Sequence, residues 1–136
     1  KIAQLVMRMQ QNVKVQEGDT PVESVEALLP IYEDFMDRLE TIIVNINKTN
    51  GATMLENMTL AQSITKRDCI KSKINAYRSL YEAATISQDR YSNTEIRFVR
   101  CVDALKLQKK IDNLSKTYRE LDTKIQGINW TIDLLQ

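Results

Sequence analysis

Large apolar residues in the C-terminal quarter of the chain recur at alternating steps of four and three. They are Leu107, Ile111, Leu114, Tyr118, Leu121, Ile125, Ile128, Ile132 and Leu135. On a helix this heptad spacing gathers the side chains into one stripe, or seam, which is stable only against other helices. The pattern therefore predicts a long helix from about Asp103, a good N-cap residue, to the end of the chain.

Two further helices are predicted in the first 50 residues. The first runs from Ile2 to about Val15, and the polar stretch 16–21, with its glycine and proline, is the loop that follows. The second helix starts near Ser24, and Pro30 is expected to bend it or to delay its start. Its seam repeats the spacing of the last helix: Val25, Leu28, Tyr32, Phe35, Leu39, Ile42 and Ile46.

A third long helix is predicted after a loop at 51–58. It begins near Thr59, and its seam consists of Leu60, Ile64, Ile70, Ile74, Tyr77, Tyr81 and Ala84. The segment 90–103 has no helical period and alternates weakly between apolar and polar residues. We expect it to form a short irregular or extended arm.

These patterns together predict an all-α fold, an antiparallel bundle of long helices with heptad seams and the arm near 90–103. With 136 residues the chain is expected to form a single helical-bundle domain over 1–136. Apolar residues make up 43% and charged residues 27%, which is typical of a folded globular chain. Three glycines and two prolines leave room for few turns, as long helices require.

Charge is distributed unevenly, although the formal net charge is only +1. Residues 17–40 contain eight acids against Arg38 alone, whereas residues 66–110 contain eleven bases against five acids. The basic stretch suits either an anionic partner or a complementary acidic helix face. We favour the second interpretation, because helical surfaces with mixed charge are common.

Several classes of chemistry lack their usual residues. The chain contains no histidine, which removes the most frequent general base and metal ligand. No glycine-rich phosphate loop or nucleophile motif occurs, so we expect no cofactor and assign no catalytic residue. Asp34, Asp37 and Glu40 share one helix face but have no matching acidic pair on a later helix. We interpret them as a solvated face and expect no metal site.

Two observations bear on the compartment. Cys69 and Cys101 lie 32 residues apart without a metal-binding spacing, which is typical of reduced thiols in an intracellular protein, although a disulfide between them stays open. The chain shows no apolar run of about 20 residues and no signal peptide. We therefore expect a cytoplasmic protein.

Arg67 interrupts the seam of the third helix at a core position and is followed by Asp68. A guanidinium inside a helical core needs a partner, because an unpaired buried charge is costly. One interpretation is a binding site for a carboxylate or phosphate. The other, which we favour, is an ion pair or amide network that fixes helix register. Candidate partners are Asn45, Asn47, Asn50, Glu82 and Asn129.

Four stretches of the chain resemble the septicolysin-like family of short bacterial proteins. They are Asn12–Gly18, Ile46–Asn50, Gln88–Ser92 with Glu95–Arg97, and Leu114–Gln126 leading into Asn129-Trp130. The resemblance implies an all-helical protein and a name that suggests a cytolysin. It supplies no catalytic residue. Matched or nearby polar residues become candidates for a ligand-binding site: Asn47, Asn50, Arg67, Asp68, Arg90, Tyr91 and Asn129.

The sequence thus favours a non-enzymatic cytoplasmic protein that self-associates or docks to a protein partner. We expect a homo-oligomer, with a dimer favoured, because apolar residues beside the seams exceed what one bundle can cover. They are Met36, Ile43, Val44, Leu80 and Leu134. We expect neither nucleic acid nor membrane as a partner. The alternatives are a small hydrolase or ligand-binding protein that uses a polar cluster around Arg67, and a cytolysin.

Overall fold

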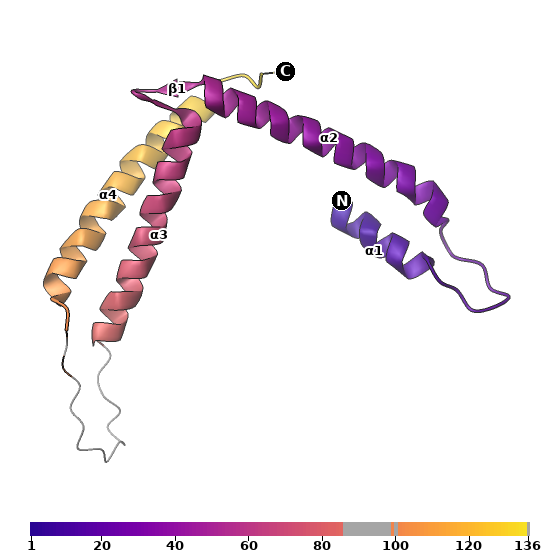
Figure 1. The fold of residues 1–136 in the computed structure, drawn as a ribbon, viewed down its shortest axis with the longest axis horizontal. Coiled ribbons are helices and arrows are strands. Elements are labelled where there is room, and N and C mark those ends of the chain that lie inside the picture. The colour runs from indigo at the N-terminus through magenta and orange to yellow at the C-terminus, as the bar shows by residue number, and fades with distance from the viewer. Residues whose placement is uncertain (86–98, 100, 136) are drawn as a thin grey trace, which may run out of the picture. The chain divides into compact units, whose positions relative to one another are not determined.

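The structure is a computed structural model that describes residues 1–85, 99 and 101–135 (Figure 1). The described part contains helices α1 (Ile2–Asn12), α2 (Val25–Ala52), α3 (Leu60–Thr85) and α4 (Ala104–Asn129), and the short strands β1 (Met54–Leu55) and β2 (Met58–Thr59). The predicted mostly helical architecture with antiparallel helices is confirmed.

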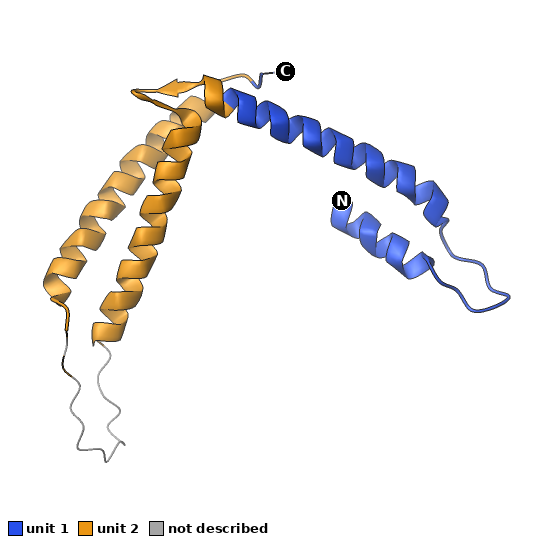
Figure 2. Cartoon of the chain, viewed as in Figure 1, with its two compact units in different colours: residues 1–49, 134–136 blue, residues 50–133 orange. Residues whose placement is uncertain are grey.

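The chain divides into two compact units (Figure 2). Unit 1 consists of residues 1–49 and 134–136, and unit 2 consists of residues 50–133. The single domain over 1–136 stays a prediction.

Unit 1 is built on the first half of α2, along which α1 lies antiparallel (Figure 1). Leu5 of α1 and Leu28 of α2 are buried where the two helices pack. The start of α2 agrees with the predicted cap, because Ser24 Oγ accepts a hydrogen bond from the Ala27 amide at 3.4 Å. Pro30 lies inside the helix, so it does not delay the start.

Unit 2 is an antiparallel pair of long helices, α3 and α4, which pack seam to seam (Figure 1). Two apolar clusters fill the interface. The first contains Leu55, Leu60, Ile64, Leu121, Ile125, Ile128 and Ile132. The second contains Ile70, Ile74, Tyr77, Tyr81, Leu107, Ile111, Leu114 and Tyr118. The heptad spacing therefore predicted the core of this unit correctly on both helices.

The loop predicted at 51–58 contains a β hairpin that the sequence did not indicate. Met54 pairs with Thr59 and Leu55 with Met58, and Glu56 adopts the left-handed conformation with φ of 55°. Strands of two residues are too short to show an alternating pattern. Leu55 points into the first apolar cluster, which closes the end of the α3–α4 pair.

Helix α4 starts as predicted but ends earlier. Asp103 caps it, because its Oδ1 accepts hydrogen bonds from the amides of Leu105 and Lys106 at 3.0 and 3.2 Å. The helix stops at Asn129 instead of running to the chain end. Leu135 belongs to unit 1, and its amide donates a hydrogen bond to Thr49 Oγ1 at 2.8 Å. This bond is not part of the helical hydrogen bonding of α4. Most of the predicted arm near 90–103 lies outside the described residues.

Candidate functional site

Arg67 lies on α3 at the edge of the α3–α4 interface, with its side chain 21% exposed. Its Nη1 donates to Asp122 Oδ1 of α4 at 3.0 Å, and its Nε donates to Asp68 Oδ1 at 3.0 Å. The guanidinium is thus held between two carboxylates. This arrangement crosses from one helix to the other and matches the register-fixing interpretation.

The protonation of Arg67 follows from the same contacts. Burial lowers its pKa, but the hydrogen bonds to Asp68 and Asp122 outweigh that penalty, so the pKa is raised. The side chain therefore stays charged and is neutralised inside the protein. An external anion would have to compete with two carboxylates that already occupy the guanidinium.

The sequence named the wrong partners for Arg67. Among the described residues it bonds to Asp68 and Asp122, and not to any of the asparagines or to Glu82. The reason is helix register, because the antiparallel packing of α3 on α4 brings position 122 opposite position 67. That pairing could have been obtained by aligning the two predicted seams head to tail.

The other candidate site residues are scattered along the chain. Asn47 is exposed on α2, and Asn50 is half-buried near the end of that helix. Asn129 is the exposed last residue of α4. Arg90 and Tyr91 lie outside the described residues. Of the predicted cluster, the structure brings together Arg67 and Asp68, which are neighbours in sequence.

A basic groove of about 320 Å³ lies between α3 and α4, and sequence reasoning missed it. Its lining consists of Lys71, Ile74, Asn75, Arg78, Ser115, Tyr118 and Arg119. Within the described part of the chain, no carboxylate forms an ion pair with its three cations. The sequence did contain a signal for this groove, because each of the three cations is adjacent to a seam residue.

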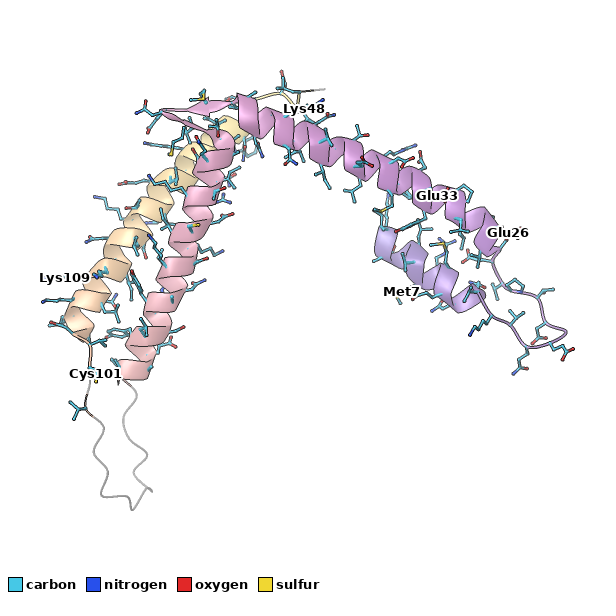
Figure 3. All side chains as sticks on the ribbon, viewed as in Figure 1. Met7, Glu26, Glu33, Lys48, Cys101 and Lys109 are labelled. Atoms are coloured by element: carbon cyan, nitrogen blue, oxygen red, sulfur yellow. The ribbon has the colours of Figure 1, made fainter. Side chains whose placement is uncertain are left out.

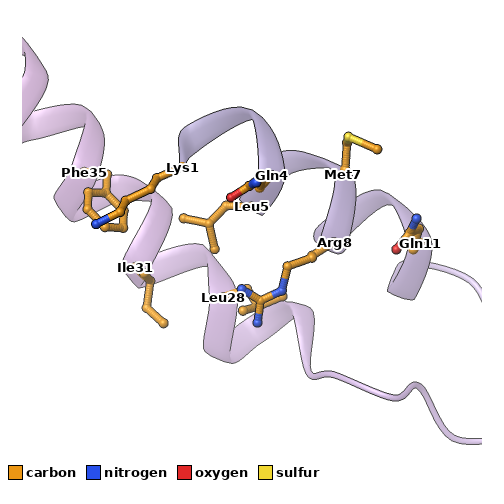
Figure 4. A pocket seen from close by; sticks show the side chains of 9 residues that line it. All are labelled: Lys1, Gln4, Leu5, Met7, Arg8, Gln11, Leu28, Ile31 and Phe35. Carbon is orange, nitrogen blue, oxygen red and sulfur yellow. The ribbon is translucent and has the colours of Figure 1, made fainter.

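A larger apolar pocket of about 620 Å³ lies in unit 1 between α1 and α2 (Figure 4). Leu5, Leu28, Ile31 and Phe35 supply apolar surface, and Arg8 stands at the rim. The Arg8 guanidinium is already occupied, because its Nε donates to Glu23 Oε2 at 2.9 Å. This hydrogen bond lowers the pKa of Glu23, although burial of the carboxyl opposes the shift.

Residues 36–46 of α2 include six exposed apolar side chains, which we call the exposed face. It consists of Met36, Leu39, Ile42, Ile43, Val44 and Ile46, whose exposed fractions lie between 37% and 49%. Met36, Leu39, Ile43 and Val44 line a shallow hollow of about 270 Å³ together with Asp37 and Glu40. Side chains project along this length of α2 in Figure 3.

Two features are absent from the described residues. None of the helices is both long enough and apolar enough to cross a membrane. No group of three or more histidine, cysteine, aspartate or glutamate side chains is arranged to hold a metal ion. Cys69 and Cys101 are both exposed, and both are free thiols.

The chain matches a family of proteins over nearly its whole length. The matching family model is described as a family of unknown function, DUF6847, and it covers residues 1–134. No protein with a curated description matches. A crystal structure of a functionally unknown conserved protein from Corynebacterium diphtheriae is similar, with 38% sequence identity and a TM-score of 0.90. The match covers 98% of this chain and 88% of that one. The chain therefore belongs to the DUF6847 family.

Proposed function

We propose that this chain is a non-enzymatic helical protein that acts by binding a second copy of itself through the exposed face of α2. The observation that supports the proposal is the apolar surface itself. Six large apolar side chains on one helix stay between 37% and 49% exposed, and three of them, Leu39, Ile42 and Ile46, belong to the heptad seam of that helix. Burying them against a second copy removes apolar area from water, which is the dominant favourable term in association.

The five apolar residues that led us to expect a homo-oligomer support the same proposal. Met36, Ile43, Val44, Leu80 and Leu134 are all between 38% and 51% exposed. A two-fold dimer is the commonest assembly of identical chains, so we propose a dimer.

Ligand binding around Arg67 is less well supported. Its guanidinium already pairs with Asp68 and Asp122, so a bound carboxylate or phosphate would have to compete with two carboxylates. The absence of histidine from the sequence likewise gives no support to the hydrolase alternative.

We extend the proposal to a cytoplasmic protein that resembles septicolysin-like proteins in sequence but does not lyse membranes. The free thiols of Cys69 and Cys101 suit a reducing compartment. Asp37 and Glu40 border the exposed face, and anionic lipid headgroups would repel them. Dye release from anionic vesicles at physiological salt tests this part, and leakage at submicromolar protein would restore the cytolysin alternative.

A pair of variants tests self-association through α2. Leu39→Glu combined with Ile43→Glu places two charges in the exposed face, where burial against a partner would be costly. Thr41→Glu is the matched control, because it adds a charge to an exposed position of the same helix outside that face. Light scattering after size exclusion should give a monomer for the double variant and a dimer for the control. A double variant that dimerises like the parent chain refutes the proposal.

A further inference from the structure

The basic groove of unit 2 has an unusual charge arrangement for a helix–helix edge. Lys71 and Arg78 lie seven residues apart on α3, and Arg119 lines the same groove from α4. Opposite charges normally face each other at such flanking positions, and like charges destabilise the pairing. Next to them, Arg67 and Asp122 follow the usual rule. Among the described residues, Lys71, Arg78 and Arg119 therefore have no carboxylate partner, although their position favours one.

The floor of the groove is apolar as well as basic. Ile74 is 5% exposed and contributes to the second apolar cluster, while Tyr118 is half-buried beside it. A partner that fits this surface would present carboxylates next to apolar side chains. A free phosphate would satisfy the cations but would leave the apolar floor in water.

Helix α2 presents such a surface. Glu33, Asp37 and Glu40 form an acidic row, and no described side chain forms an ion pair with any of them. Asp37 and Glu40 border the hollow lined by Met36, Leu39, Ile43 and Val44. Glu33 projects from the same helix in Figure 3.

The two rows also match in length. Glu33 and Glu40 are seven residues apart, as are Lys71 and Arg78. Seven residues of α-helix span about 10 Å, so two carboxylates on one helix can meet two cations on another at the same time. Partly desolvated pairs of this kind give specificity and fix register at an interface.

We propose that the acidic row of α2 in one copy of the chain docks in the basic groove between α3 and α4 of a second copy. This inference rests on the proposed self-association and names the surface that receives α2. Under two-fold symmetry the contact forms twice, with each copy supplying one acidic row and one groove. The unequal charges of the two sequence stretches then serve recognition between copies.

Charge reversal on each side tests the docking. One chain has Glu33→Lys, Asp37→Lys and Glu40→Lys, and we call it the acid-reversed chain. The other has Lys71→Glu, Arg78→Glu and Arg119→Glu, and we call it the groove-reversed chain. Each alone places like charges in both contacts of its homodimer, whereas an equimolar mixture pairs opposite charges in both contacts. Sedimentation should give monomers for each chain alone and a one-to-one heterodimer for the mixture.

A charge-reversal control and a set of single replacements complete the experiment. A chain with Lys66→Glu, Lys73→Glu and Lys109→Glu reverses three exposed bases that do not line the groove, and it should dimerise like the parent. If a triple variant fails to fold by circular dichroism, the single changes Glu40→Lys and Arg78→Glu replace it. Each single change should weaken dimerisation about tenfold, and mixing the two chains should recover part of the loss.

The experiment distinguishes docking in the groove from self-association by another surface. Docking in the groove is refuted if the reversed chains dimerise as the parent does, or if the mixture stays monomeric while the parent is a dimer. Self-association itself would stand in either case. A parent chain that is monomeric refutes both. A third chain carries all six changes. If this chain is a monomer with a higher melting temperature than either triple variant, and the mixture forms no heterodimer, the acidic row and the groove meet within one chain. That result overturns the proposal.

Discussion

Helix α2 and the α3–α4 pair have the same heptad spacing but differ in what covers it. On α3 and α4 the seams meet, and Leu60, Ile74 and Ile125 are at most 5% exposed. On α2 only the first half is covered, by α1, and Leu39, Ile42 and Ile46 remain 37% to 49% exposed. Apolar spacing thus identifies a packing surface without identifying the partner that covers it.

The largest effect in this contrast is expected when one seam residue in each region is truncated to alanine. Ile125→Ala removes a fully buried side chain packed on Leu55 and Leu60, and it should lower the free energy of unfolding by about 2–5 kcal/mol. Ile42→Ala changes an exposed position and should cost within about 0.5 kcal/mol at concentrations where the chain is monomeric. Urea denaturation followed by circular dichroism measures both, and equal losses would abolish the contrast.

A smaller effect is expected from the ion pair that crosses between α3 and α4. Arg67→Ala leaves the Asp122 carboxylate without its partner, and we expect a loss of about 1–3 kcal/mol, because Asp122 is partly solvated. Replacing the pair with Arg67→Met and Asp122→Leu should recover most of that loss.

Lys71→Ala is the control for the ion pair. Lys71 has no carboxylate partner among the described residues, so at concentrations where the chain is monomeric its removal should leave the melting temperature unchanged or raised. An unchanged melting temperature for Arg67→Ala would return Arg67 to the list of ligand-binding candidates.

The smallest effect concerns how α1 is held on α2. The hydrogen bond from Arg8 lowers the pKa of Glu23. The ionised carboxylate therefore stabilises folded unit 1 fully at pH values above the ordinary pKa of glutamate. That contribution is lost as the pH falls through the lowered folded-state pKa. NMR shifts of the Leu5 methyl groups should change with acidification in the parent chain and much less in Glu23→Gln. Identical titrations of the two chains would exclude this role for the pair.

The sequence predicted the long helices well because their signal is repeated over many turns. Residues such as Ile111 and Ile125 recur at regular steps, and Asp103 has the chemistry of an N-cap. The β hairpin, by contrast, depends on a single contact, the burial of Leu55 in the first apolar cluster. Single tertiary contacts leave no periodic trace in a sequence.

The candidate site was harder to predict for a related reason. Arg67 was recognised because a charge interrupts an apolar seam, but its partner depends on helix register, which no single helix reveals. The cations Lys71, Arg78 and Arg119 are ordinary surface residues until α3 and α4 are paired. The residues of a site that is assembled across two helices can therefore be identified only after the pairing of the helices is known.

Sedimentation equilibrium of the unmodified chain at physiological salt measures whether the chain associates with a second copy. If a second copy covers the exposed face of α2, the measured mass should approach that of two 15.7 kDa chains as concentration rises. The same fit would give the dissociation constant. A single species of 15.7 kDa at every concentration would refute self-association through α2.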